Sequence, residues 1–393
     1  MSSCSGFPPN TGSKLSKPRV LVLSDNQFQG VLPIFLCNAS MLQDLEIVAT
    51  YLSGTILRCL GTYQKDLSIV LIAENQFEAT NSANWAFLAS LTNCSNLRKI
   101  CLDSNKFEGV IPNSVGNLST RMEFLSIEDN KITRSIPEGI GNLTNLVDLD
   151  MDNNILVGAI PASLGKLKKL NRLPLSKNAM SRSIPVALGN LTELNELILG
   201  ANAISGSIPP SLDTCPLEVL DLSHNNFSGS IPRELFSIST LSGSMDHAHN
   251  SLSGTLPSEV ENLRNLNEID FSNNMISIEI PDSISGCESL VYLNLSRNFL
   301  QGTVPLSIGN LRGLLRLDLS YNNLSGTIPE ILGRLIGIYS LNLSFNKLKG
   351  EGPRDGVFRN ATVVLITGND GLCGGIPQLK FPPYSNHSTM KPS

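Results

Sequence analysis

The chain has few aromatic residues and few charges, and each shortage narrows what it can be. Aromatic residues make up 5% of its 393 residues, with a single Trp, and charged residues 16%, whereas hydrophobic residues reach 41%. This balance excludes a disordered protein and requires a largely aliphatic core. The net charge of −5 comes without any basic run. We therefore expect no nucleic-acid partner, because phosphate contacts need clustered Lys and Arg.

Long apolar runs are also missing. No stretch approaches the roughly 18 consecutive apolar residues that cross a bilayer, so we expect no membrane span in this chain. The first residues, MSSCSGFPPNTGSK, lack the apolar region of a secretory signal.

What the sequence has in abundance is an internal repeat. Residues 146–161 read LVDLDMDNNILVGAIP and residues 314–329 read LLRLDLSYNNLSGTIP; both match L-x-x-L-x-L-x-x-N-x-L-x-G-x-I-P. Upstream, Asn26 and Asn75 fit the pattern with Thr50 between them, which gives about 14 repeats over roughly residues 18–353. The repeat Asn returns every 23 to 25 residues, a leucine-rich-repeat period, at Asn105, Asn130, Asn154, Asn178, Asn202, Asn225, Asn250, Asn274, Asn298, Asn322 and Asn346.

This spacing predicts the fold. L-x-L alternates with a period of two, so it forms a short strand, and each strand returns one repeat later as a parallel neighbour. One repeat cannot bury its leucines alone, whereas stacked repeats close a continuous core. The Asn side chain carries a donor and an acceptor, so it can bond backbone groups of the adjacent coil and form a ladder. We predict an α/β repeat fold, a leucine-rich-repeat solenoid. It has a curved, superhelical parallel sheet on its concave face and short 3-10, helical or extended segments on its convex face.

Several repeats depart from the pattern. Arg134, Arg182 and Ile278 stand in place of the turn Gly. His247 stands where other repeats carry Leu, which predicts a polar or strained neighbourhood. The gap from Asn75 to Asn105 is longer and contains Trp85, and we interpret it as a longer convex helical segment with Leu88 and Leu91 inward.

The L-x-G-x-I-P and L-G-N-L elements resemble the plant-specific class of leucine-rich repeats. Residues 81–97, NSANWAFLASLTNCSNL, resemble an early insert of one subfamily of plant receptor-like kinases, and residues 356–383, GVFRNATVVLITGNDGLCGGIPQLKFPP, resemble its C-terminal cap. That subfamily includes the flagellin and elongation-factor-Tu receptors and the rice bacterial-blight resistance receptor. The resemblance implies a secreted, glycosylated ectodomain on a plasma-membrane kinase. Such an ectodomain binds a peptide or protein ligand on its inner surface and recruits a co-receptor kinase near its C-terminal repeats.

The chain departs from this family at both ends. It shows no N-terminal cysteine cap and no kinase motif, and Tyr384 stands where the family places the Cys that pairs with Cys373. We therefore expect an ectodomain truncated at both ends that is itself no enzyme. The expected domains are a disordered or non-native N-terminus at 1–17, the solenoid at 18–353, a cap-like segment at 354–383 and a disordered tail at 384–393.

Cysteines and sequons give weaker signals. The eight cysteines show no metal-ligand spacing, and Cys94, Cys215 and Cys287 are expected to be small buried thiols. The N-x-S/T sequons exceed chance only modestly, so they indicate either a glycoprotein or a composition rich in Asn, Ser and Thr. They lie at Asn38, Asn93, Asn117, Asn142, Asn190, Asn226, Asn294, Asn323, Asn342, Asn360 and Asn386.

Two patches are predicted on the concave face, where neighbouring strands lie about 4.8 Å apart. The first gathers negative charge and is either an ordinary solvated face or a patch for a basic peptide. The second gathers Tyr and Arg, which are typical interface residues, and is either a scattered set or a co-receptor contact. The first comprises Asp103, Glu123, Glu128, Asp129, Asp148, Asp150 and Asp152; the second comprises Tyr292, Arg297, Arg316, Tyr321, Tyr339 and Phe345.

Catalysis has little support in the sequence. His247 and His249 lack a third metal ligand at useful spacing, so we predict no catalytic, cofactor or metal site. The favoured function is the ligand-recognition module of a plant receptor-like kinase in pathogen-perception or defence signalling, at the outer face of the plasma membrane. The alternatives are a soluble extracellular inhibitor of a cell-wall-degrading enzyme and a non-functional truncated remnant.

Overall fold

The computed structural model of the protein describes residues 17–376 and residue 378. The chain forms two compact units, the first ending at Leu217 and the second beginning at Glu218. Each unit is built from the same repeated coil. The expected N-terminal segment and C-terminal tail fall almost entirely outside the described residues, as do Tyr384 and Asn386.

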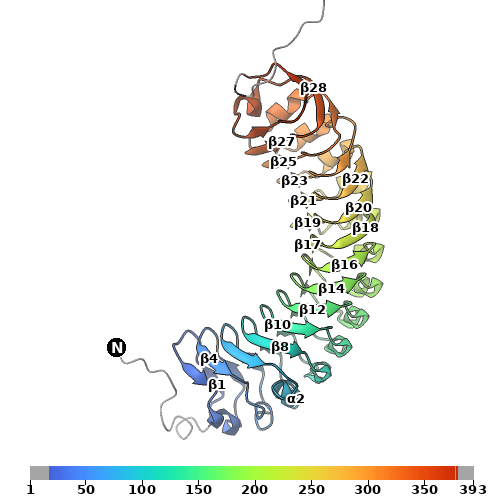
Figure 1. The fold of residues 1–393 in the computed structure, drawn as a ribbon. Helices are drawn as coiled ribbons and strands as arrows, with labels where there is room; N and C mark the ends of the chain where they lie inside the picture. The colour runs from blue at the N-terminus through green and yellow to red at the C-terminus, as the bar shows by residue number, and fades with distance from the viewer. Residues whose placement is uncertain (1–16, 377, 379–393) are drawn as a thin grey trace, which may run out of the picture. The chain divides into compact units, whose positions relative to one another are not determined.

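The L-x-L segments form the main sheet in each unit (Figure 1). Each strand buries its central residue and leaves its neighbours half-buried or exposed, as in Asp148–Asp150 around Leu149. Consecutive strands pair in parallel one repeat apart, with Leu125 opposite Leu149 and Leu293 opposite Leu317. The first unit contributes β1 (Val20–Val22), β3 (Asp44–Glu46), β5 (Ile69–Leu71), β7 (Lys99–Cys101), β9 (Phe124–Ser126), β11 (Asp148–Asp150), β13 (Arg172–Pro174) and β15 (Glu196–Ile198). The second contributes β17 (Val219–Asp221), β19 (Ser244–Asp246), β21 (Glu268–Asp270), β23 (Tyr292–Asn294), β25 (Arg316–Asp318), β27 (Ser340–Asn342) and β29 (Val364–Leu365).

The segment after each repeat Asn forms a second set of parallel strands. Its turn residue has a left-handed backbone, which Gly adopts in most repeats and Arg134, Arg182 and Ile278 adopt in the others. In the first unit these strands are β2 (Gln29–Val31), β4 (Tyr51–Gly54), β6 (Gln76–Ala79), β8 (Lys106–Val110), β10 (Lys131–Arg134), β12 (Ile155–Gly158), β14 (Ala179–Arg182) and β16 (Ala203–Gly206). In the second they are β18 (Asn226–Ser230), β20 (Ser251–Gly254), β22 (Met275–Ile278), β24 (Phe299–Leu300), β26 (Ser325–Gly326), β28 (Lys347–Glu351) and β30 (Gly371–Cys373).

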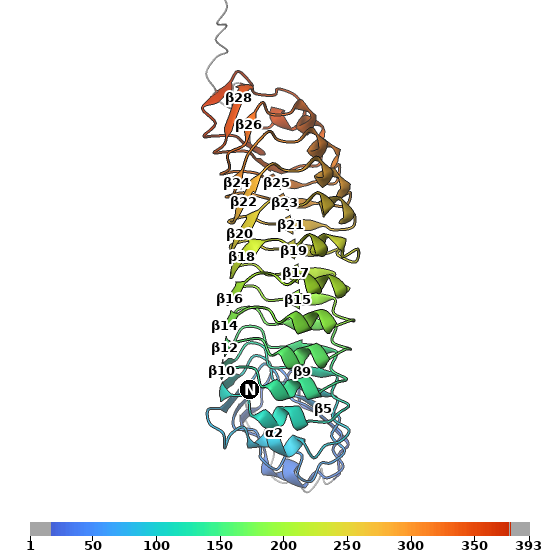
Figure 2. The same cartoon turned by 90° about the vertical axis from the view of Figure 1, so that its right-hand side faces the viewer.

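Short 3-10 helices complete the coil. Most begin directly after the Pro of the I-P element, whose fixed φ places an extended residue at the helix start, as at Pro161 and Pro305. Figure 2 shows these helices along one side of each unit and the second-sheet strands along the other, with the main sheet between them. They are η1 (Ile34–Asn38), η2 (Asn113–Asn117), η3 (Glu138–Asn142), η4 (Ala162–Lys166), η5 (Val186–Asn190), η6 (Pro210–Thr214), η7 (Arg233–Ser237), η8 (Ser258–Asn262), η9 (Asp282–Gly286), η10 (Leu306–Asn310), η11 (Glu330–Arg334) and η12 (Gly356–Arg359).

The repeat Asn side chains connect neighbouring coils. The Asn154 side chain donates to the carbonyl of Ile127 at 2.9 Å and accepts from the amide of Ile132 at 3.0 Å, both in the preceding repeat. The same geometry recurs along both units, and Asn369 extends it by bonding Leu343 and Leu348. Each Asn thus pairs backbone groups that would otherwise be buried without partners. The predicted leucine-rich-repeat solenoid is confirmed.

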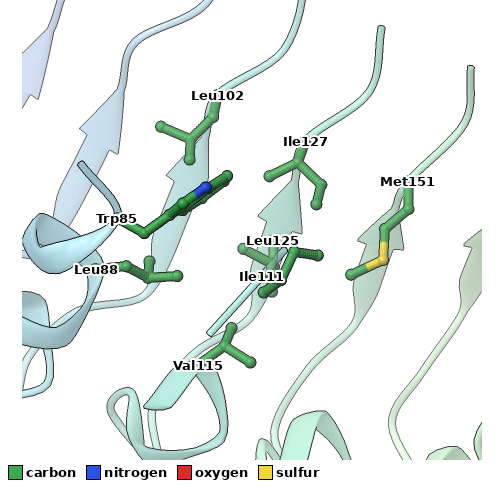
Figure 3. Close-up of a pocket in the computed structure, with 8 residues that line it drawn as sticks. All are labelled: Trp85, Leu88, Leu102, Ile111, Val115, Leu125, Ile127 and Met151. Atoms are coloured by element: carbon green, nitrogen blue, oxygen red, sulfur yellow. The ribbon is translucent and has the colours of Figure 1, made fainter. Parts of the chain in front are cut away.

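The long gap before Asn105 contains α2 (Ala86–Leu91), with Leu88 and Leu91 buried, as predicted. Trp85 precedes it, and its Nε1 donates to the carbonyl of Glu108 at 2.9 Å. Figure 3 shows the apolar cavity beside this ring, lined by Trp85, Leu88, Leu102, Ile111, Val115, Leu125, Ile127 and Met151. Its volume is about 10 Å³, too small for more than one water, and its walls offer few polar groups. It is therefore a packing void and not a ligand site.

The structure confirms the buried thiols predicted from the sequence, adds a disulfide, and places His247 in the core. Cys94, Cys215 and Cys287 are buried free thiols, as expected. A disulfide joins Cys37 and Cys59, which no motif had indicated. Of the two surroundings predicted for His247, polar or strained, the polar one is wrong: the ring is fully buried against Phe271, and neither ring nitrogen has a hydrogen-bond partner among the described residues.

Candidate ligand-binding faces

Four carboxylates gather at the ends of strands β7, β9 and β11 in the first unit. We call Asp103, Glu128, Asp150 and Asp152 the acidic cluster. Burial raises the pKa of Asp150 to about 7, and the negative charges of Asp152, Glu128 and Asp103 add to that effect. Burial also raises the pKa of Glu128, and the negative charges of Asp103, Asp152 and Asp129 add to that effect. The cluster therefore holds negative charge at an electrostatic cost.

Backbone and side-chain donors fix the orientation of this cluster. Asp103 Oδ1 accepts from the Ser126 hydroxyl at 2.5 Å and from the Glu128 amide at 2.9 Å. Its Oδ2 accepts from the Cys101 thiol at 2.9 Å. Asp150 Oδ1 accepts from the Asp152 amide at 3.1 Å. The carboxylates are held in place by the strands that carry them, which suits preorganised recognition of a cation.

The other residues of the predicted acidic patch lie in different surroundings. Asp148 bonds Arg172 at 2.8 Å, and Arg172 also bonds Glu196 at 2.8 Å. Asp129 accepts from the side chain of Asn153 at 2.7 Å. Glu123 lies at the start of its strand and pairs with Arg98 at 2.7 Å. The structure thus brings four of the seven residues together and separates Glu123 from them.

Arg172 could have been identified from the sequence. It occupies the same strand position as Asp148 one repeat earlier and Glu196 one repeat later. Reading that column predicts an alternation of charges, in which a cation pairs with the carboxylates on both sides.

The predicted second patch is a set of stacked side chains in the second unit. The Arg297 guanidinium lies 4.3 Å from the centre of the Tyr321 ring, and Tyr321 stacks on Phe345 at 4.4 Å. Arg316 lies 4.9 Å from the centre of the Tyr292 ring. Tyr321 and Phe345 remain 41% and 45% exposed, and Tyr339 is also exposed.

This stack belongs to one column of the repeat. Arg297, Tyr321 and Phe345 each precede a ladder Asn and have a left-handed backbone. His224 and His249 occupy the same column, with their rings stacked at 4.0 Å. The stacking of His249 on His224 was not predicted from the sequence, which suggested only a chance metal pair of His249 with His247.

The sequons differ in accessibility. The side chains of Asn294 and Asn342 lie on the main-sheet face, where they donate to Asp270 at 2.9 Å and Asp318 at 3.0 Å. Asn323 is half-buried. The exposed sequon residues are Asn38, Asn93, Asn117, Asn142, Asn190, Asn226 and Asn360.

The described residues contain neither a metal-binding cluster nor a membrane-spanning helix. Among residues 17–376 and 378, no group of three or more His, Cys, Asp or Glu side chains is arranged to hold a metal ion. Within the same residues, no helix has both the length and the apolar character needed to cross a bilayer.

Comparisons with known proteins agree with this architecture. The family models that match are described as leucine-rich repeat region over residues 70–208, and as leucine rich repeat over residues 216–238, 248–300 and 313–335. The receptor kinase-like protein Xa21 of Oryza sativa subsp. japonica is 44% identical over 66 residues, which are 17% of this chain and 6% of that protein.

Solved structures match over much more of the chain. The crystal structure of a TDR receptor is 30% identical with a TM-score of 0.86, covering 94% of this chain and 63% of that one. The Arabidopsis receptor kinase HAESA, solved with the peptide hormone IDA and the co-receptor SERK1, is 25% identical with a TM-score of 0.61, covering 94% of this chain and 76% of that one. The chain thus spans a small part of Xa21 and under two thirds of the TDR receptor chain.

The chain belongs to the leucine-rich-repeat proteins. Within them, it has the repeat type and fold of the ectodomain of a plant leucine-rich-repeat receptor-like kinase.

Proposed function

We propose that the chain is the ligand-recognition module of a plant receptor-like kinase, displayed at the outer face of the plasma membrane for pathogen perception. Its ligand is a peptide or protein segment that binds the concave face of the first unit. The observation that carries this proposal is the acidic cluster, where burial and the neighbouring carboxylates raise the pKa of Asp150 and of Glu128. A cationic ligand side chain beside Asp150 and Asp152 relieves that repulsion on binding.

The similar structures support the peptide class of ligand. HAESA was solved with a peptide hormone and a co-receptor bound. A leucine-rich-repeat face exposes many independent side-chain positions along one sheet, which suits recognition of an extended chain.

Peptide selection on the purified chain tests the proposal. The probe is a phage-displayed library of random dodecapeptides, and the affinity of the selected peptides is measured by calorimetry. We expect basic peptides, and we expect D103N/D152N to weaken their binding about tenfold because two of the four carboxylates of the cluster are lost. The control E138Q/D213N removes two negative charges from helices η3 and η6 of the same unit and leaves the affinity unchanged. Failure to select any peptide overturns the proposal.

We further propose that the second patch contacts a co-receptor kinase. Its support is the exposed stack of Arg297, Tyr321 and Phe345, since Arg and Tyr dominate interface energetics. Y321A/F345A is expected to abolish ligand-dependent association with a co-receptor ectodomain while leaving peptide affinity unchanged. If association survives in this variant, the co-receptor contact lies elsewhere.

A further inference from the structure

A hollow at the starting ends of the first unit's strands is the positively charged counterpart of the acidic cluster. It is lined by Arg98, Arg121, Glu123, Asn145, Val147 and Lys169, and we call it the basic pocket. Its volume of about 460 Å³ lies in the range of small-ligand sites. The sequence pattern groups Glu123 with the acidic patch, whereas the structure places it among cationic side chains.

The repeat brings these side chains together from two columns. Arg98, Glu123 and Val147 immediately precede strands β7, β9 and β11. The Glu123 amide donates to the Arg98 carbonyl, and the Val147 amide donates to the Glu123 carbonyl. Arg121, Asn145 and Lys169 lie two residues earlier in their repeats. Strands about 4.8 Å apart therefore carry both columns into one hollow.

Within the part of the chain that the structure describes, no carboxylate forms an ion pair with Arg121 or Lys169. Arg98 forms a two-bond pair with Glu123, at 2.7 and 3.0 Å. Arg121 instead donates to the side-chain carbonyl of Asn96 at 3.0 Å, and Lys169 to that of Asn145 at 2.8 Å. Three cations and one carboxylate line the pocket, so its lining has a net charge of +2.

The electrostatics of Glu123 agree with this arrangement. The hydrogen bond from Arg98 lowers the pKa of Glu123, and the charges of Lys99 and Lys169 lower it further. Asn145 is itself held by a bond from its Nδ2 to the Thr120 carbonyl at 2.7 Å, so the acceptor of Lys169 is fixed. The pocket therefore presents oriented donors around an exposed apolar side chain, that of Val147.

We propose that the basic pocket binds an oxyanion of the same peptide whose cationic group lies on the acidic cluster. The proposal rests on the proposed function and specifies its ligand as a dipolar peptide. Arg98 precedes β7 and Asp103 follows it, five residues further on, so their Cα atoms lie about 15 Å apart along an extended chain. An extended peptide spans that distance in four or five residues. The oxyanion is a side-chain carboxylate or a sulfate or phosphate ester, which share the same donors.

The test uses the full chain and the dodecapeptides selected on it. R121Q/K169Q is expected to weaken the selected peptides about tenfold, since both unneutralised cations are removed. The control K106Q/K131Q removes two positive charges from strands β8 and β10 and is expected to change affinity less than about twofold. Replacing the acidic residue of the peptide by Gln is expected to lower its affinity for the wild-type chain by the same factor. The same replacement is expected to leave the affinity for R121Q/K169Q unchanged.

The outcomes separate the two proposals. Peptides that bind R121Q/K169Q as tightly as the wild type overturn the basic pocket and leave the proposed function standing. If no peptide binds the wild type, the proposed function fails and the pocket fails with it. Exchanging the peptide Glu for a sulfated or phosphorylated Tyr identifies the preferred oxyanion: tighter binding assigns an ester, and weaker binding a carboxylate.

Discussion

The imidazole of His247 packs against the ring of Phe271, with 5.2 Å between ring centres, inside the core of the second unit. Other repeats place an apolar side chain at this point, such as Leu295 or Leu319. A buried imidazole without hydrogen-bond partners lowers the stability of the folded state.

Replacing His247 by Leu is expected to raise the free energy of unfolding by about 1–3 kcal/mol at pH 7, because it removes unpaired polar atoms from the core. Chemical denaturation of H247L and wild type measures this. L295H is the matched converse variant and is expected to destabilise the chain. Loss of stability in H247L would contradict this account of the site.

His247 is also expected to make the free energy of unfolding depend on pH. Burial lowers the pKa of His247 to about 4, below the value near 6.5 of an unfolded chain. Between these values the unfolded state binds a proton that the folded state does not, so stability falls as pH falls from about 6.5 to 4. The stability difference between H247L and wild type is expected to widen over this range. A constant difference would show that His247 does not titrate as proposed.

The ionisation of Asp150 is expected to change stability with pH in the opposite direction. Burial and neighbouring carboxylates raise its pKa to about 7, so its ionisation costs stability as pH rises from about 4 to 7. D150N keeps the acceptor for the Asp152 amide and is expected to gain about 1–2 kcal/mol at pH 8, a figure reduced because the carboxylate is partly solvated. The gain is expected to vanish near pH 4. A gain that is the same at both pH values would contradict the assignment.

The left-handed turn residue Ile278 is a source of strain. It is β-branched, has a φ of 72° and is 54% exposed, so its side chain gains little from burial. I278G is expected to stabilise the chain by about 1 kcal/mol. Met275, in the same strand and 45% exposed, is the control, and M275G is expected to destabilise it. Thermal unfolding of both variants compares the two effects.

Replacing an Asn of the ladder is expected to lower the free energy of unfolding substantially. Asn154 to Ala leaves the Ile132 amide and the Ile127 carbonyl without their bonds, which is expected to cost about 2–4 kcal/mol. N171A removes an exposed side-chain bond to the Glu193 carbonyl, at a residue without a left-handed backbone, and is expected to cost less than about 0.5 kcal/mol. Equal losses in the two variants would mean that the ladder contributes no special stability.

The sequence pattern predicted the fold well because the same local pattern of leucines and Asn recurs in every repeat. The L-x-L alternation indicates each strand, and the Asn identifies each inward turn. The Cys37–Cys59 disulfide and the His224–His249 stack were missed because they depend on side-chain contacts between neighbouring coils.

The candidate sites were only partly predictable for the same reason. The sequence identified the carboxylates of the acidic cluster, but it did not pair Glu123 with Arg98 or Asp148 with Arg172. Those pairings follow from the register between strands, which decides which side chains face one another. It also did not distinguish Asn294 and Asn342, whose amides are engaged by Asp270 and Asp318, from sequons in exposed turns.

The most direct test of the central claim is to map where a selected dodecapeptide touches the chain. The peptide carries a photoreactive group, and mass spectrometry identifies the residues that it labels. We predict labels on the main-sheet face of strands β7, β9, β11 and β13, between the basic pocket and the acidic cluster. Labels confined to the 3-10 helices or to the second-sheet strands would contradict recognition on the concave face.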